Sequence, residues 1–355
     1  MVLAQSLFEN ITYSFDTFLQ AVGKETTATQ GIKHSTVSVK NFFMANRIDW
    51  YCFYDKIANH VLFLDTGNPV ITGSRFLDKT LQELTVSWEN TSVFLTHFHV
   101  DHSGNLAYCL DRGSNGAYFI APDAYDDSLV SQFLSWTRSS DAIRCDEQAC
   151  QHLELLFGKD YFDGVNLDKC HHVGAGDAFD IAGYHLEVLP TPGHVSEHAC
   201  LIDYEKGLLV AGDHLIYAKP GTMQLKPDQH LMYHYIESLK TLDSYKLSSV
   251  LMSHHDPLFY SAEIHEFIHH TWKSYEDFLP NFHERIKNLG PITVYGLASA
   301  KANQYPQGIN TFAPSAQIRR IALMFGSLEA LYDYELMERR LDDDGAYVYF
   351  TKRRL

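Results

Sequence analysis

Short apolar runs that end in turn residues dominate the first two thirds of the chain and predict strands. Residues 61–64 form one such run, closed by the turn Asp65-Thr66-Gly67, and residues 35–39 are β-branched with partial alternation. Further strands are predicted by the runs at 92–95, 118–121, 184–189, 199–203, 207–211 and 248–252. Apolar residues at helical spacing predict helices after Gly104, over 230–243 and over 261–289. Because strands and helices mix without a regular βαβ rhythm, we expect a layered α/β fold.

Two segments depart from this pattern. Residues 123–175 are rich in Asp, Ser, Gln and aromatic residues, and we predict that they form a helical insertion over a cleft. From Pro291 the character changes again, and the chain ends in an apolar run at 346–350. We therefore expect a catalytic domain over residues 1–280 and a small C-terminal domain over residues 281–355.

Composition and charge narrow the classes of protein. A length of 355 residues predicts about two domains, and 45% hydrophobic residues exclude a mainly disordered chain. The net charge of −16 makes nucleic acid an unlikely partner, because such binding needs Lys and Arg to neutralise phosphates. No apolar run approaches the ~20 residues of a membrane helix. No signal peptide is visible and the six cysteines are scattered, so we expect a cytoplasmic protein with reduced thiols and no membrane partner.

The strongest chemical signal is the motif HxHxDH, which comprises His97, His99, Asp101 and His102. Nitrogen and oxygen donors at this density suit borderline divalent metals, above all zinc. Alternation along an extended chain puts His97 and His99 on one side, while Asp101 and His102 fall in the turn beyond. Since one metal seldom takes four ligands from so short a span, the spacing predicts two metals.

Three later elements fit the same design. The turn Pro192-Gly193-His194 presents an imidazole from a fixed backbone, and a buried strand ends in Gly212-Asp213. The strand at 248–252 leads into Ser253-His254-His255. Each element alone is a weak signal, because an Asp after a strand is commonly a turn or capping residue.

Taken in this order, the motifs resemble the metallo-β-lactamase-fold hydrolases over residues 35–275, with the turn at 65–67 preceding the site. The resemblance implies an αββα sandwich with two metals at one edge of its sheets. It assigns one metal to His97, His99 and His194, the other to Asp101, His102 and His254, and a bridging role to Asp213. Lactamases proper usually have Cys at that last position, so the resemblance favours the glyoxalase II, lactonase and phosphodiesterase branches over antibiotic hydrolysis.

The order of elements after residue 281 resembles the small winged-helix-like domain found in some members of this superfamily, including thioesterase-like ones. From Arg285 onward, basic residues exceed acidic ones by only about three. So small an excess on an acidic protein favours a packing or homodimerisation role over contact with nucleic acid.

The activity implied is metal-dependent hydrolysis of a carbonyl ester or thioester of a small acyl substrate. Two metals would lower the pKa of a shared water and stabilise the oxyanion formed on attack. Asp101 and Asp213 would ligate the metals and orient the hydroxide. Zinc is the first expectation, with iron or manganese as alternatives. We expect His198, His214 and Tyr217 to contact substrate. The alternatives are that His198 orients a ligand or is structural, and that His214 and Tyr217 belong to the core.

Several alternatives remain at this point. A lactonase, or a phosphodiesterase or nuclease, could use the same metals, although the acidic charge disfavours nucleic acid. An iron oxidoreductase is disfavoured because no electron-carrier domain is attached. A non-enzymatic sensor with a DNA-binding winged helix is disfavoured by the complete set of seven ligands. Turnover of generic esters would separate an enzyme from a sensor.

A second histidine pattern, the HExxH of His265-Glu266-Phe267-Ile268-His269, is the zincin signature on a predicted helix. Zincins need a third ligand, for which Glu284 is the convenient candidate downstream. This reading leaves the HxHxDH motif unexplained. We favour an amphipathic helix whose polar flank carries histidines.

The pair His254-His255 leaves the last ligand to be chosen. Each of the other ligand elements places a small or turn-forming residue directly before its ligand, and Ser253 does so for His254. Alternation from Met252 also directs His254 to the sheet edge. We therefore predict that His254 is the ligand and that His255 supports the site from behind.

Overall fold

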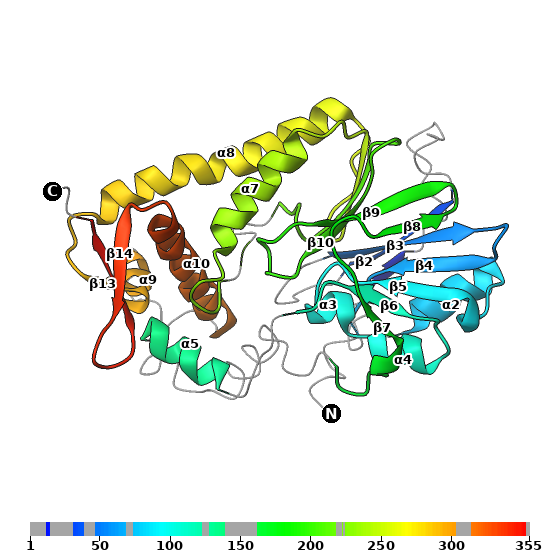
Figure 1. The fold of residues 1–355 in the computed structure, drawn as a ribbon, viewed down its shortest axis with the longest axis horizontal. Helices are drawn as coiled ribbons and strands as arrows, with labels where there is room; N and C mark the ends of the chain where they lie inside the picture. Colours follow the sequence, from blue (N-terminus) through cyan, green and yellow to red (C-terminus); the bar gives the residue numbers. More distant parts are fainter. Residues whose placement is uncertain are drawn as a thin grey trace.

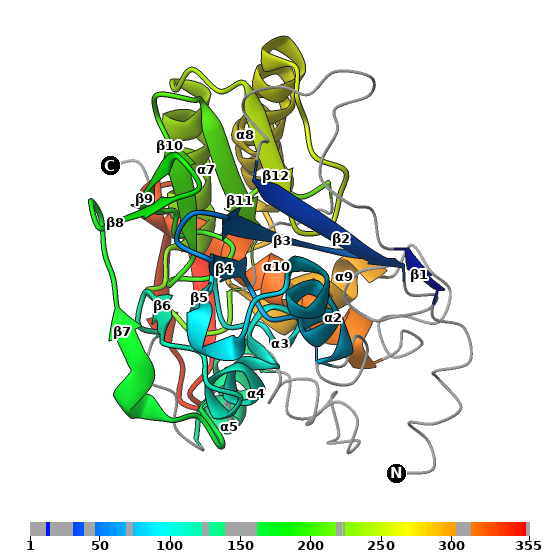
Figure 2. The ribbon, with the colours of Figure 1, turned by 90° about the vertical axis from the view of Figure 1, so that its right-hand side faces the viewer.

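The computed structural model describes residues 12–14, 31–38, 47–68, 74–122, 128–138, 162–217, 222, 224–302 and 314–352. Two large sheets face each other, and a smaller three-stranded sheet lies at the far end of a long helix (Figure 1). A view turned by 90° shows the same arrangement (Figure 2).

The first sheet holds seven strands in chain order. They are β1 (Thr12–Ser14), β2 (Ile32–Ser38), β3 (Arg47–Asp55), β4 (His60–Leu64), β5 (Thr91–Phe94), β6 (Ala117–Phe119) and β7 (Cys170–His172). β1 to β4 pair antiparallel, and β4 to β7 pair parallel. The helices α2 (Arg75–Leu84) and α4 (Leu106–Asp111) pack on its outer face, and short 3₁₀ turns lie at η2 (Trp88–Asn90) and η3 (Leu167–Lys169).

The second sheet holds five strands in the order β12-β11-β10-β9-β8. Their bounds are β8 (Ala178–Ile181), β9 (Tyr184–Pro190), β10 (Ala199–Asp203), β11 (Leu208–Gly212) and β12 (Ser249–Met252). The helices α7 (Leu231–Asp243) and α8 (Ser261–Ile286) cover its outer face. The layers therefore run helix, sheet, sheet, helix, which confirms the predicted αββα sandwich (Figure 1).

β4 shows why its sequence is apolar at consecutive positions. Val61 and Phe63 belong to the hydrophobic cluster under α2 and α4, while Leu62 and Leu64 belong to the cluster between the two sheets. Side chains alternate between the faces of a strand, so a strand buried on both faces is largely apolar, as residues 61–64 are. The strand ends at Leu64, and the φ of +62° at the next residue, Asp65, turns the chain toward the site.

The C-terminal unit is built from β13 (Ile292–Thr293), α9 (Val294–Ala302), α10 (Pro314–Asp333), β14 (Met337–Leu341) and β15 (Tyr347–Thr351). Its antiparallel sheet has the order β13-β15-β14. The predicted boundary at 280 falls within α8, so one continuous helix leads into this unit. The buried face of α10 shares one hydrophobic cluster with α7 and α8. The winged-helix assignment stays a prediction.

The segment predicted as a helical insertion is only partly helical. α5 (Leu129–Thr137) is a helix, but β7 is the edge strand of the first sheet, because residues 170–172 pair with β6. Phe133 of α5 packs against Phe325 of α10, with ring centroids 6.5 Å apart. Arg138 forms ion pairs with Asp342 and Asp344 of the β14–β15 hairpin. The described helix of the insertion thus lies on the C-terminal unit, and residues 139–161 lie outside the described part.

Two expectations about the chain as a whole can be compared with the structure. Within the described residues, no helix combines the length and apolarity needed to cross a membrane. Cys52, Cys109, Cys170 and Cys200 are free thiols, while the other two cysteines lie outside the described residues.

Candidate metal centre

The loop after β5 supplies four candidate ligands. His97 and His99 lie in the turn that directly follows the strand, and Asp101 and His102 lie in the one-turn helix α3 (Val100–Ser103). Each of the four side chains is at most 3% exposed. Burial of four ionisable groups is costly unless they are paired or bind a cation, so their clustering needs a partner.

His194 is presented by a turn that requires glycine. Gly193 has a φ of +148°, and a Cβ there would lie 2.5 Å from the Cα of Tyr235 in α7. The close approach of turn and helix fixes the backbone that carries His194.

Asp213 directly follows Gly212, the last residue of β11, and the structure requires a glycine at this position too. Gly212 has a φ of +50°, and a Cβ there would lie 2.8 Å from both Thr96 Cβ and His198 Nε2. Only glycine lets the end of β11 approach the loop after β5, and this approach brings Asp213 to the histidines.

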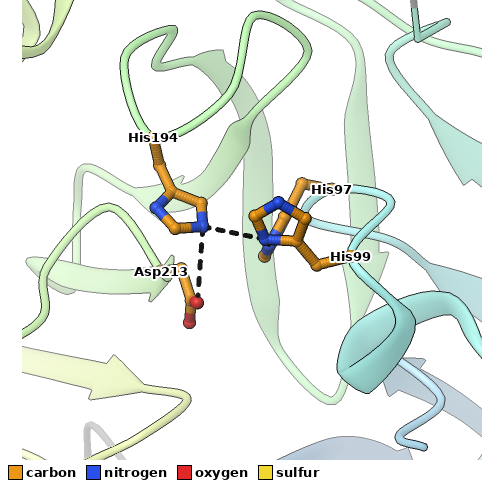
Figure 3. A group of neighbouring side chains, drawn as sticks. All are labelled: His97, His99, His194 and Asp213. Carbon is orange, nitrogen blue, oxygen red and sulfur yellow. Dashed lines mark hydrogen bonds and ion pairs between the residues drawn. The ribbon is translucent and has the colours of Figure 1, made fainter. Parts of the chain in front are cut away.

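The side chains of His97, His99, His194 and Asp213 converge from these three elements (Figure 3). His99 Nδ1 lies 3.0 Å from His97 Nε2 and 3.1 Å from His194 Nε2. His194 Nε2 lies 3.5 Å from Asp213 Oδ2. One donor atom from each residue lies within 4.8 Å of all the others, a spacing that one metal ion could bridge.

Asp101, His102 and His254 form a second group with the same property. His254 Nε2 lies 3.6 Å from Asp101 Oδ2 and 3.1 Å from Asp213 Oδ1. His102 Nε2 lies 3.4 Å from Asp213 Oδ1. Asp213 therefore faces both groups, and the structure brings together all seven residues that the sequence singled out.

The two histidines after β12 have different surroundings. The side chain of His254 is 14% exposed and points at Asp101 and Asp213. His255 is exposed, and its ring lies 4.0 Å from the ring of Tyr217, measured between centroids. His255 thus contacts Tyr217, whereas His254 contacts the carboxylates of the two groups.

The polar atoms at this centre fit a bound cation. Asp101 Oδ1, His102 Nε2 and Asp213 Oδ1 are buried and have no aligned hydrogen-bond partner among the described residues. Buried polar atoms without a partner are rare in folded proteins and call for an explanation. Imidazole and carboxylate donors suit zinc and related divalent ions, so the residues fit the metals that the motif predicts.

Protonation differs between the two groups. Burial and the neighbouring imidazoles hold the pKa values of His97 and His99 well below their usual range, which leaves their lone pairs available to a metal. Burial also disfavours protonated His254, but Asp213 and Asp101 outweigh it and raise the pKa of His254 to about 9. The field of the carboxylates therefore favours positive charge at the second group.

The segment that carries this centre matches a known protein family. The family model described as the metallo-beta-lactamase superfamily matches residues 59–254, more than half of the chain. The chain belongs to the metallo-beta-lactamase superfamily. The matched segment contains all seven candidate ligands, and members of this superfamily typically bind two metal ions.

Curated relatives in the superfamily align over part of their length. An atrochrysone carboxyl ACP thioesterase from Emericella nidulans is 24% identical over 195 residues, which are 55% of this chain and 48% of the relative. A hydroxyacylglutathione hydrolase from Legionella pneumophila is 25% identical over 173 residues, or 48% of this chain and 49% of the relative. The chain thus spans about half the length of these relatives.

Solved structures of superfamily proteins share the fold over nearly the whole chain. A beta-lactamase domain protein from Burkholderia ambifaria aligns with a TM-score of 0.70 at 17% identity, covering 99% of this chain and 100% of its own. A metallo-beta-lactamase family protein from Thermus thermophilus aligns with a TM-score of 0.59 at 19% identity, covering 91% and 99%. At these identities the likeness shows the fold alone.

Asp65 contacts the candidate metal centre, although the sequence did not single it out as a site residue. Its Oδ2 lies 2.7 Å from His102 Nδ1, and its Oδ1 accepts the backbone N–H of Thr96 at 2.8 Å. A carboxylate on the far nitrogen of a ligand histidine fixes its tautomer and orientation. The turn Asp65-Thr66-Gly67 after a buried strand was the available signal.

His198 does not occupy the substrate-contact position expected from the sequence. It is 0% exposed, its Nδ1 lies 2.8 Å from Thr191 Oγ1, and its Nε2 accepts the backbone N–H of Asp213 at 3.2 Å. A ring without exposed surface cannot touch a substrate in this conformation. His198 therefore positions Asp213.

His214 is corrected in the same way. It is 0% exposed, and its Nε2 lies 2.8 Å from Ser238 Oγ of α7. Tyr217, in contrast, is 50% exposed and contacts His255 and Phe267, with ring centroids 4.0 and 4.4 Å away. Of the three expected substrate contacts, only Tyr217 has the exposure for that role, which stays a prediction.

The zincin alternative lacks its third ligand. His265, His269 and Glu284 all lie on α8, and 15 residues of helix separate the last two by about 22 Å at 1.5 Å per residue. Glu284 instead forms an ion pair with Lys287 at 2.5 Å. HExxH here is not a zincin centre built with Glu284.

Proposed function

We propose that the protein is a metal-dependent hydrolase that cleaves a carbonyl ester or thioester of a small acyl substrate. The observation that carries this proposal is the pair of adjoining His/Asp groups with Asp213 facing both. Two groups that share one carboxylate suit a dinuclear centre better than one isolated metal.

Each group has a role that its geometry supports. Two divalent ions, with zinc as the first choice, would acidify a water molecule and stabilise negative charge on a carbonyl oxygen. His97, His99 and His194 would hold one ion, and Asp101, His102 and His254 the other. Asp213 faces His194 on one side and His254 on the other, so its two oxygens can serve both ions. Asp101 Oδ1, buried and without a hydrogen bond, can orient a water or hold its proton.

The substrate class rests on the relatives and on the rim of the site. One curated relative is named a thioesterase and another a hydroxyacylglutathione hydrolase. The half-exposed ring of Tyr217, close along the chain to Asp213, offers an apolar surface to an acyl group. The acidic net charge of −16 opposes polyanionic substrates. We infer an acyl thioester or ester of a small molecule.

A substrate panel tests the proposal. Protein reconstituted with zinc, manganese or iron would be assayed on acyl thioesters, simple esters, lactones and phosphodiesters at equal concentrations. We expect thioester or ester turnover that Asp213→Asn lowers at least 100-fold, because the variant removes a charge that both groups face. Cleavage of lactones alone, or of phosphodiesters without ester turnover, would replace the proposed reaction by that one.

A further inference from the structure

A pair of histidines on α8 faces a carboxylate at the end of α7. His265 and His269 are four residues apart, so they lie on the same face of the helix. His265 Nδ1 lies 3.2 Å from Asp243 Oδ1, and His269 Nδ1 lies 3.1 Å from Asp243 Oδ2. The carboxylate of Asp243 thus pairs with the Nδ1 atom of each ring. None of these three residues belongs to the centre described above.

This arrangement fixes the tautomer of both rings. A carboxylate only accepts hydrogen bonds, so each Nδ1 carries the hydrogen and each neutral ring keeps its lone pair on Nε2. Within the described residues, the hydrogen bonds of His265 and His269 engage Nδ1 and leave Nε2 for another ligand. Metal-binding histidines are typically held in this way, with the far nitrogen donating to a carboxylate.

The surroundings of the pair favour a cation. The two rings border a cavity of about 680 Å³, and their side chains are 33% and 59% exposed, so ions can reach them. The charged residues lining the cavity are Asp243, Glu266, Lys273 and Asp277, three carboxylates and one ammonium. The ammonium of Lys273 lies 3.0 Å from Asp277 Oδ1, which offsets its charge. A negative cavity with two imidazoles concentrates divalent cations.

We propose that His265 and His269 form a second, labile metal site that binds a divalent transition-metal ion through their Nε2 atoms. Asp243 fixes the two rings, and water or a carboxylate of the cavity completes the coordination. Imidazole ligands select copper, nickel and zinc over magnesium or calcium. With two protein ligands and partial exposure, the site exchanges its ion readily, in contrast to the seven-ligand centre. This proposal is independent of the hydrolase activity.

Trp272 supplies a direct readout. Its ring lies 4.6 Å from the ring of His269, and its Nε1–H donates to Asp243 Oδ2 at 3.0 Å. Copper(II) bound to the pair would quench its fluorescence at this distance. The experiment titrates copper(II) into the full chain, preloaded with zinc and freed of excess metal. Trp272→Phe identifies the share of the signal that this ring contributes among the four tryptophans.

We expect saturable quenching of Trp272 in the wild type. In the double variant His265→Ala/His269→Ala, half-maximal quenching should require at least a tenfold higher copper(II) concentration. His270→Ala is the matched control, because His270 lines the same cavity but is not held by Asp243. It should titrate like the wild type. Asp243→Asn should weaken binding by about 10–100-fold, as loss of a carboxylate behind a ligand histidine does.

Equal titrations of the wild type and the double variant would overturn the proposal. So would an equal loss in His270→Ala, which would indicate diffuse surface binding. If the double variant does not fold, the single variant His269→Gln keeps a good helix former and replaces the ring, and the same comparison then decides. Hydrolase turnover is measured in parallel and should stay within twofold of wild type in all of these variants.

Discussion

Replacement of Asp65 by Asn tests how the second ligand group is held in place. Asn keeps the size of the side chain and one oxygen that can accept from the Thr96 backbone N–H. It replaces the oxygen 2.7 Å from His102 Nδ1 by an NH₂ group. His102 Nδ1 must then accept a hydrogen bond, so the ring proton moves to Nε2, the atom that faces Asp213. A protonated Nε2 has no lone pair for a metal.

The expected loss follows from this switch of tautomer. Removal of the carboxylate behind a ligand histidine costs about 10–100-fold in metal affinity. This corresponds to about 1.4–2.7 kcal/mol at 1.36 kcal/mol per factor of ten. The loss should fall mainly on the group of Asp101, His102 and His254, because Asp65 contacts His102 directly, whereas Thr96 Oγ1 lies between Asp65 and His97 of the other group. One metal should therefore weaken and the other remain.

Competition between the apoprotein and a chromophoric chelator measures both affinities in one zinc titration. Asp78→Asn is the matched control. Asp78 also accepts part-buried hydrogen bonds, from Trp88 Nε1 and Tyr108 OH, but it is not one of the candidate metal ligands or their hydrogen-bond partners. Two zinc equivalents bound with wild-type affinity by a folded Asp65→Asn protein would refute the role assigned to Asp65. Equal weakening in the control would show a general loss of packing instead.

Three further outcomes are expected. His254→Ala should lower zinc affinity more than about 100-fold, beyond the loss for a supporting residue, whereas exposed His255→Ala should keep its metal content in elemental analysis. Gly212→Ala should lower the free energy of unfolding in denaturant by about 1–3 kcal/mol more than Gly290→Ala, because both have positive φ but only Gly212 has neighbours at 2.8 Å. Burial opposes ionised Asp243, but hydrogen bonds from one indole and two imidazoles lower its pKa below the 3.8 of the free group. The ionised carboxylate then contributes stability that is present above pH 3.8 and is lost as the pH falls through the lower folded pKa. The free energies of unfolding of Asp243→Asn and the wild type should therefore differ above pH 3.8 and converge below the folded pKa.

Local patterns predicted the ligands because each is tied to an element with its own sequence signal. His97 and Asp213 directly follow apolar strands, and His194 follows a turn that only glycine can make. The unbroken apolar run at 61–64 likewise predicted β4, since its two apolar faces meet different layers. The order of these signals along the chain carried the resemblance to the superfamily, and the resemblance implied that the seven residues meet at one edge of the sandwich.

The local signals did not show which residues meet across long separations in the sequence. Asp65 meets His102 across 37 positions of sequence, and no periodicity pairs them. His198 and His214 look in sequence like cleft residues beside a ligand, but the approach of β11 to the loop after β5 buries the first, and α7 covers the second. β7 was missed because a three-residue edge strand has too few positions for alternation to show.

The same distinction explains why one histidine motif lies in the candidate metal centre and the other does not. His97 and His99 leave a strand that is buried on both faces, so their burial forces them to meet charged partners from other elements. His265 and His269 stand on the flank of an amphipathic helix and keep contact with water. Spacing alone gives both pairs the potential to bind metal. The layer in which the backbone lies decides that the first pair is enclosed with five further ligands, while the second has a single carboxylate and an open cavity.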